Sequence, residues 1–349
     1  MRHIGVDLHK TNFVACFIGD DDTQHIETYP LTRDGLARFT QQLDASDELA
    51  VEATQNVHHF YDRVKAHVAR VAVVDTYRFG VVAKSKKKTD KADARALARF
   101  LKLGWLPEVS VPSEQVRTLR QLLQARETLV SMRTKLKNMA HAAFSRNGVA
   151  LRRASFASAA GRGRLSARAE LPEADRLVLD VALRQIAQLD AEIKAVEAEV
   201  VRRGKSLRGV SRLLQVHGLN LLSAISLLAE VGDIALFDTS KQLVSYAGLA
   251  TSTRQSSETT RHGGITKRGR KRLRTVCIQA VLAMVNRTDT PLMEFYQKKK
   301  REKGAGKAIC ATARKLLTII FVLLKKGLDY WYLEDRLYNR KLRALNAAA

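Results

Sequence analysis

Four acidic residues occupy positions where folding alone does not explain a carboxylate: Asp7, Glu52, Asp90 and Asp93. Asp7 and Glu52 each end a short apolar run, and such runs are typical of buried strands. Asp90 and Asp93 are three residues apart in an Ala- and Leu-rich stretch that predicts a helix, so they share one face. Crowded carboxylates repel one another unless a cation neutralises them, and Mg²⁺ is the usual cation for oxygen ligands. The acids therefore predict a magnesium site, beside which His9 could position a phosphate or a water, or be an ordinary loop residue.

A second segment with chemical potential lies far along the chain. Residues 246–258 concentrate Ser and Thr between Gly residues, and a basic stretch follows at 262–274. A serine hydroxyl beside cations and backbone amides could attack a phosphodiester and form a phosphoserine link. The alternative is a flexible loop whose cations hold phosphates without reacting. Residue types alone favour this alternative, because the loop contains no obvious neutral base to activate a serine, although His262 is near in sequence.

The charge balance indicates the partner. Sixty Lys and Arg against 35 Asp and Glu leave a formal charge of +25, which favours association with nucleic acid. A merely basic soluble or ribosomal-type protein is the alternative. Aromatic residues make up only 6% of the chain, so we expect contacts to the backbone rather than stacking on bases. The basic residues expected to make these contacts are Lys84, Lys86, Lys87, Lys88, Arg254, Lys267, Arg268, Lys271 and Arg272.

Cysteine usage and hydropathy indicate where in the cell the protein is expected to be. Cys16, Cys277 and Cys310 are far apart without metal-ligand spacing, which argues against a disulfide framework or a zinc site. The N-terminus enters a strand-like segment at once, so we expect no signal peptide. The longest uncharged apolar run, residues 316–324, is about half the length needed to span a bilayer. We therefore expect no membrane contact and a cytoplasmic protein that is nucleoid-associated when bound to DNA.

The order of elements predicts the framework that positions the acids. The first part, residues 1–108, is predicted to be α/β in the order of a ribonuclease-H-like domain, in which the central strand carries the first acid. Several α/β folds share this order, and the acids at the strand ends are what favour this one. Its expected strands are 3–8, 12–18, 25–30, 49–53 and 71–75, and its expected helices lie near 36–43 and 57–68.

The rest of the chain is predicted to be mainly helical. Apolar residues at helical spacing predict helices at 113–146 and 172–203, which we interpret as a coiled-coil region, 109–204, interrupted by a loop at 150–171. A C-terminal domain, 205–349, opens with a helix, a Gly-containing turn at 217–220 and a second helix. That pattern fits a helix-hairpin-helix, whose turn amides could hold a DNA phosphate.

Two distant motifs carry a family resemblance. The first comprises GVDLHK at 5–10, VEAT at 51–54 and DKADA at 90–94, and the second is SYAGLATSTRQSSETTRHGGITKRGRKRLR at 245–274. In this order they resemble bacterial insertion-sequence transposases with a DEDD tetrad, the IS110 family, which is related to the Piv DNA invertase. The resemblance covers nearly the whole chain.

The resemblance implies specific parts and partners. It implies an N-terminal RuvC-like domain of ribonuclease-H fold, a coiled coil and a C-terminal transposase domain. It also implies a homo-oligomer, a dimer or tetramer, and an element-encoded structured RNA that pairs with target and donor DNA. The family's metal-binding tetrad falls on the four acids, with Mg²⁺ as cofactor, and its nucleophilic serine falls on Ser256. Ser257 stands where the family usually has Gly, and residues 217–220 depart from the family's Pro-Gly-Ile-Gly turn.

The predicted function is thus that of an insertion-sequence transposase, a recombinase that exchanges DNA strands through Ser256 and the magnesium-binding tetrad. The alternatives are a RuvC-like, structure-selective nuclease with water as nucleophile, and a non-catalytic RNA-binding protein whose acids are structural.

Overall fold

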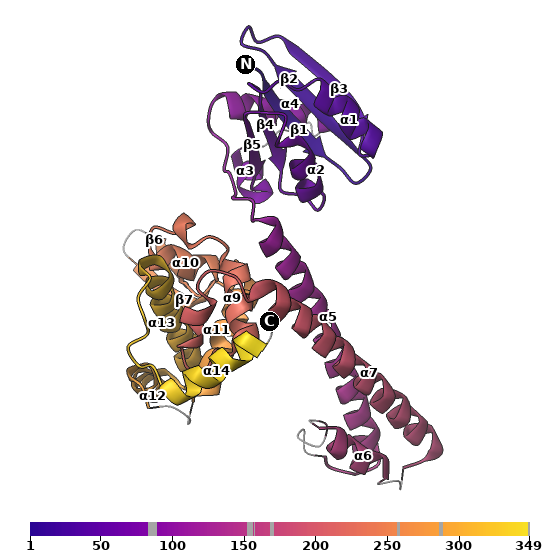
Figure 1. Ribbon diagram of the computed structural model, residues 1–349, viewed down its shortest axis with the longest axis vertical. Coiled ribbons are helices and arrows are strands. Elements are labelled where there is room, and N and C mark those ends of the chain that lie inside the picture. The colour runs from indigo at the N-terminus through magenta and orange to yellow at the C-terminus, as the bar shows by residue number, and fades with distance from the viewer. Residues whose placement is uncertain are drawn as a thin grey trace. The chain divides into compact units, whose positions relative to one another are not determined.

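The chain forms two compact units. The computed structural model describes residues 1–82, 89–151, 156, 158–167, 171–256, 259–285 and 289–347. The first unit comprises residues 1–111 and the second residues 112–349 (Figure 1). The predicted class, an α/β part followed by a mainly helical part, is confirmed, whereas the finer division at 108 and 204 stays a prediction. None of the helices in the described ranges is long and apolar enough to cross a membrane.

The first unit is built on a five-stranded sheet in the order β3-β2-β1-β4-β5. β1 pairs antiparallel with β2 and parallel with β4, so β1 lies at the centre. All five strands were predicted to within one residue at either end. They are β1 (His3–Leu8), β2 (Asn12–Ile18), β3 (Gln24–Pro30), β4 (Glu48–Glu52) and β5 (Arg70–Val74).

The two faces of this sheet are covered differently. Ile4, Val6 and Leu8 alternate onto one face, where they join the core formed with α1 (Arg33–Gln41) and α2 (Val57–Val64). The residues between them lie on the opposite face, which is covered by α4 (Asp90–Lys102). A Cβ on Gly5 would lie 2.1 Å from the Ala94 carbonyl oxygen, so only glycine lets α4 approach this closely. The sequence around Gly5 therefore sets the distance between α4 and β1.

The second unit begins with a long helical hairpin. α5 (Glu114–Arg146) and α7 (Glu173–Gly204) confirm the two predicted helices. Arg126 bonds Glu197 at 2.6 Å and Arg133 bonds Asp190 at 2.6 Å. Because later residues of α5 pair with earlier residues of α7, the helices are antiparallel, as Figure 1 shows.

The segment that joins these helices was predicted to be a loop, and that prediction is wrong in part. Residues 159–167 form the helix α6 (Ala159–Ala167). Leu165 of α6 and the nearby Phe156 are buried against Phe144 and Leu179 of the hairpin. The energy of burying these two side chains outweighs the low helix propensity of the two glycines in α6.

The remainder of the second unit packs around one apolar core. Its helical elements are α8 (Val210–Leu214), α9 (Leu221–Val231), η2 (Ile234–Leu236), α10 (Ser240–Tyr246), α11 (Lys271–Met284), α12 (Pro291–Lys303), α13 (Ala305–Lys326) and α14 (Asp335–Ala347). α8, a Gly-containing turn and α9 follow the predicted order, and the Asn220 side chain caps α9. The phosphate contact expected of that turn stays a prediction.

Candidate active site

Asp7 and Glu52 lie at the same end of the sheet, where the carboxyl ends of β1 and β4 meet; we call this end the sheet edge. β1 and β4 are parallel, and Val6 pairs with Val51, so each acid directly follows a paired residue at the carboxyl end of its strand. The alternation of the strands puts Asp7 on the face that carries Gly5 and α4. The sheet therefore presents one acid at the end of each of two neighbouring strands, as the sequence predicted.

Asp90 and Asp93 belong to the first turn of α4. The Thr89 hydroxyl accepts a hydrogen bond from the Ala92 amide at 3.2 Å, which fixes where the helix begins. The amides at a helix N-terminus carry partial positive charge, and they stabilise carboxylates in the first turn. This local stabilisation lets α4 hold two acids near the sheet edge.

His9 connects the strand acid to the helix acid. Its Nε2 lies 3.3 Å from Asp7 Oδ2 and 3.1 Å from Asp90 Oδ2. One ligand atom from each of these three residues lies within 4.8 Å of the other two. Nε2 is withdrawn from solvent, yet it forms no hydrogen bond with either oxygen. A nitrogen and two carboxylate oxygens that converge in this way are suitable donors for a divalent cation.

The turn that carries His9 is held by the backbone on both sides. The His9 amide donates to the Asn12 carbonyl at 3.0 Å, and the His9 carbonyl accepts from Asn56 Nδ2 at 3.3 Å. Asp7 is only 13% exposed, whereas Asp90 is 58% exposed. The acidic cluster of Asp7, His9 and Asp90 is therefore fixed on its sheet side and open on its helix side.

The structure brings together only part of the predicted tetrad. Asp7 and Asp90 share one cluster, while Glu52 and Asp93 occupy the same sheet edge and the same helical turn without joining its ligand atoms. His9 was predicted only as a possible phosphate or water contact. The sequence did contain a signal for this role: His9 follows the strand acid Asp7 by two residues, and a turn at that place can direct a side chain back over the sheet edge.

The Ser- and Thr-rich segment forms a hairpin rather than a flexible loop. β6 (Thr251–Ser256) pairs antiparallel with β7 (Thr259–Ile265), and Ser256 pairs with Thr259. The β-branched threonines favour strands and explain this correction. The structure describes only the backbone of Ser256 and Arg254. The alternative nucleophile, Ser257, and the predicted contacts Lys84, Lys86, Lys87 and Lys88 lie outside the described residues.

The two halves of the C-terminal motif meet at the base of this hairpin. The Lys267 amide donates to the Gly248 carbonyl at 3.1 Å, and the Arg270 amide donates to the Tyr246 carbonyl at 2.8 Å. Gly269 has φ of +117°, and a Cβ there would lie 2.2 Å from the Tyr246 carbonyl oxygen. The motif's glycine at 269 is therefore required by the close approach of two backbones.

The predicted nucleic-acid contacts differ in how much side chain they expose. Lys267, Arg268 and Lys271 are exposed. Arg272 instead bonds Glu230, which is 2% exposed, and Glu127 at 2.8 Å. These bonds tie the start of α11 to α9 and α5, and a phosphate contact by Arg272 stays a prediction.

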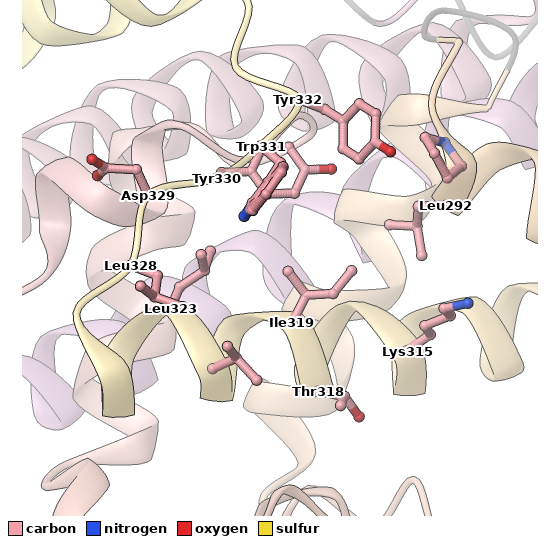
Figure 2. A pocket seen from close by; sticks show the side chains of 12 residues that line it. Leu292, Lys315, Thr318, Ile319, Leu323, Leu328, Asp329, Tyr330, Trp331 and Tyr332 are labelled. Carbon is pink, nitrogen blue, oxygen red and sulfur yellow. The ribbon is translucent and has the colours of Figure 1, made fainter.

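An apolar pocket of about 300 Å³ lies beside α13. Figure 2 shows Trp331 and Tyr332, on the segment that follows α13, across the pocket from Ile319 and Thr318. Trp331 is 92% exposed at its rim. The pocket's charged lining residues are Lys315 and Asp329, and Asp329 already accepts a hydrogen bond from Gln215 at 2.8 Å. The acids and the hairpin are therefore better candidates for a reaction than this pocket.

Comparison with known proteins matches both halves of the chain. Residues 4–146 match a model of DEDD transposases of the IS110 type, and residues 210–297 match the transposase IS116/IS110/IS902 family. The chain is 26% identical over 336 residues to the transposase for insertion sequence element IS1111A of Coxiella burnetii, covering 95% of this chain and 91% of the relative. It is 27% identical to a probable family 20 transposase of Pseudomonas aeruginosa, covering 95% and 98%. It is 25% identical to the pilin gene-inverting protein of Moraxella bovis, covering 93% and 96%.

Proposed function

Because the chain belongs to the IS110 family of transposases, it is a DNA transposase, and we propose that it cuts and rejoins DNA with Ser256 while Asp7, Glu52, Asp90 and Asp93 hold Mg²⁺. The observation that carries the proposal is the convergence of Asp7, His9 and Asp90 on one point at the sheet edge. The strand order, with the central strand carrying the first acid, supports a RuvC-like domain.

The donor set fits a divalent cation. Asp7 and Asp90 would supply oxygens, and His9 would supply an Nε2 that has no hydrogen bond to any described residue. Glu52 ends the neighbouring strand, and Asp93 lies in the same helical turn as Asp90. A bound Mg²⁺ supplies stabilisation of negative charge on a phosphate oxygen. Asp7 and Asp90 would hold the ion, and the bonds of Asn12 and Asn56 to the turn keep His9 beside them.

The proposed cleavage is a transesterification at the hairpin. The Ser256 oxygen attacks the scissile phosphorus and loses its proton. A phosphoserine bond forms as the bond from phosphorus to the DNA 3′ oxygen breaks, and that oxygen takes up a proton. A 3′ hydroxyl of the exchanging strand then attacks the phosphoserine, which restores the phosphodiester and releases the serine.

The proposal extends to the assembly. Serine and acids are more than 150 residues apart in sequence, so they act within one chain or across a dimer or tetramer that shares the α5–α7 hairpin. A structured guide RNA and the DNA would share the net charge of +25. We propose RNA guidance from the motif resemblance alone.

The test is detection of a covalent adduct on a denaturing gel. Purified protein is incubated with Mg²⁺, labelled element-end DNA and RNA transcribed from the flank, with Ser256→Ala and Ser257→Ala alongside. We expect an adduct that only Ser256→Ala abolishes. Loss in Ser257→Ala alone would move the nucleophile by one residue. Nicked product without any adduct would mean that water attacks and that the protein is a structure-selective nuclease.

A further inference from the structure

A groove of about 1480 Å³ runs between the base of the β6–β7 hairpin and the helices α12 and α13. Thr251 of β6 and Gly263, Gly264 and Ile265 of β7 form one wall. The lining residues contributed by α12, α13 and the base of the hairpin combine apolar side chains such as Phe295 with several cations, and Glu302 is the acid among them. The lining cations are Lys267, Lys299, Lys303, Lys307, Arg314 and Lys315.

Helical spacing explains why these cations share the groove. On α13, Lys307, Arg314 and Thr318 recur at intervals of seven and four residues, so they lie on one helical face. Gly304, with φ of +78°, ends α12 and turns the chain back into α13, which brings Lys303 of α12 alongside. The turn at Gly304 thus places cations of α12 and α13 side by side in the groove.

The cations differ in whether the protein neutralises them. Lys299 pairs with Glu302 at 2.6 Å, and the Lys315 ammonium lies 4.6 Å from the centre of the Phe295 ring. Lys303, Lys307 and Arg314 are exposed, and none is paired with an acid in the part of the chain that the structure describes. Three neighbouring cations repel one another, and a polyanion that neutralises them binds with favourable release of counterions.

We propose that this groove binds the phosphodiester backbone of the DNA strand that Ser256 attacks. The inference rests on the proposed function, because the hairpin that forms one wall ends in Ser256. A strand lying in the groove along Lys303, Lys307 and Arg314 is led towards that hairpin. The groove contributes affinity and register rather than sequence recognition, because cations that contact phosphates do not read bases.

The first test compares two matched triple variants. Lys303→Ala/Lys307→Ala/Arg314→Ala removes three groove cations. Lys298→Ala/Arg301→Ala/Lys326→Ala removes three exposed cations of the same helices that do not line the groove. We expect the groove variant to make the negative slope of log affinity for DNA against log salt shallower by about two to three units, since each lost phosphate contact removes roughly 0.7 to 0.9 from its magnitude. Equal losses in the two variants would overturn the proposal.

Cys310 is a natural reporter in the groove and provides a second test. It lines the groove and is partly exposed, whereas Cys16 and Cys277 are buried, so a maleimide reagent should modify Cys310 first. We expect element-end DNA to slow this modification at least about tenfold when most sites are occupied, and the groove variant to lose the protection. Absence of protection by saturating DNA would overturn the proposal.

The controls separate this inference from the serine mechanism. An RNA of the same sequence, tested alone, identifies the source of the backbone: protection by RNA but not by DNA would overturn the assignment to DNA. Ser256→Ala should keep full protection of Cys310, because binding does not need the nucleophile. If the adduct persisted in Ser256→Ala, or never formed in the wild type, the serine assignment would fail, and protection of Cys310 by DNA would still support the groove.

Discussion

The two units use acidic side chains in opposite ways. In the first unit, Asp7 and Asp90 converge on His9 at an open sheet edge. In the second, Glu230 is buried, and the protein neutralises it with Arg272, which also bonds Glu127 at 2.8 Å. Both clusters contain acids, but the second pairs its buried acid with an arginine, whereas the first places a histidine between its two acids.

This difference separates function from structure. A buried acid that lacks a cation is costly, so Glu230 needs Arg272 for the fold to be stable. The two acids of the first cluster repel each other, and this repulsion falls when a divalent cation binds. This contrast supports the proposed reaction at the first cluster, whereas the second cluster fixes the position of α11.

The largest expected effect comes from removing charge at the first cluster. We expect Asp7→Asn/Asp90→Asn to lower recombination at least about 100-fold, because loss of ligands weakens metal binding. The folded state should be unharmed or slightly more stable, since the change relieves repulsion. Recombination and thermal unfolding are measured together, with the exposed Asp34→Asn as the matched control. A clear fall in the unfolding midpoint would mean that these acids are structural as well.

The second prediction concerns the second cluster, where removal of the acid should lower stability. Glu230→Gln should lower the free energy of unfolding by about 3 to 5 kcal/mol, because it leaves Arg272 with less buried countercharge. Urea denaturation measures the loss, and the exposed Glu192→Gln on α7 should change stability by no more than about 0.5 kcal/mol. Unchanged stability in Glu230→Gln would remove the contrast between the two clusters.

The sequence predicted the first unit well because its signals are local. Apolar runs gave the five strands, and Thr89 before Asp90 marks the start of α4. The positions of Asp7 and Glu52 at strand ends were predicted from the apolar runs before them, and the structure adds that these two strands are parallel neighbours. The role of His9 did not follow, because it depends on the path of a turn held by the side chain of Asn56, 47 residues away.

The second unit was harder to predict because its contacts are distant in sequence. The helices follow from their periodicity, but the hairpin was interpreted as a loop, since its strands contain few apolar residues. The partners of Arg272 are 42 and 145 residues away, so its basic neighbours suggested phosphate contact instead of an ion pair. The groove needs the packing of α12 on α13, which no single segment reveals.

The third prediction concerns a divalent cation at the first cluster. Saturating Mg²⁺ or Mn²⁺ should stabilise the wild-type protein, by about 2.7 kcal/mol at one hundred times the dissociation constant. Asp7→Asn/Asp90→Asn should show no such gain, whereas Glu230→Gln should show all of it. Differential scanning calorimetry with and without the ion measures these shifts. Equal stabilisation of the wild type and the double variant would place the ion elsewhere.

The smallest expected effect concerns Lys341, a cation held inside the second unit. Its Nζ donates to the carbonyls of Leu214 and Val216, each at 2.9 Å, and burial lowers its pKa from about 10.5 to about 8. Between pH 8 and pH 10.5 the unfolded chain therefore binds more protons at this position, so stability contributed by Lys341 rises with pH across that window. We expect a gain of about 1 to 2 kcal/mol after solvent screening. Lys341→Met should lose this rise relative to the wild type, and an unchanged pH profile would show that α14 does not bury the charge.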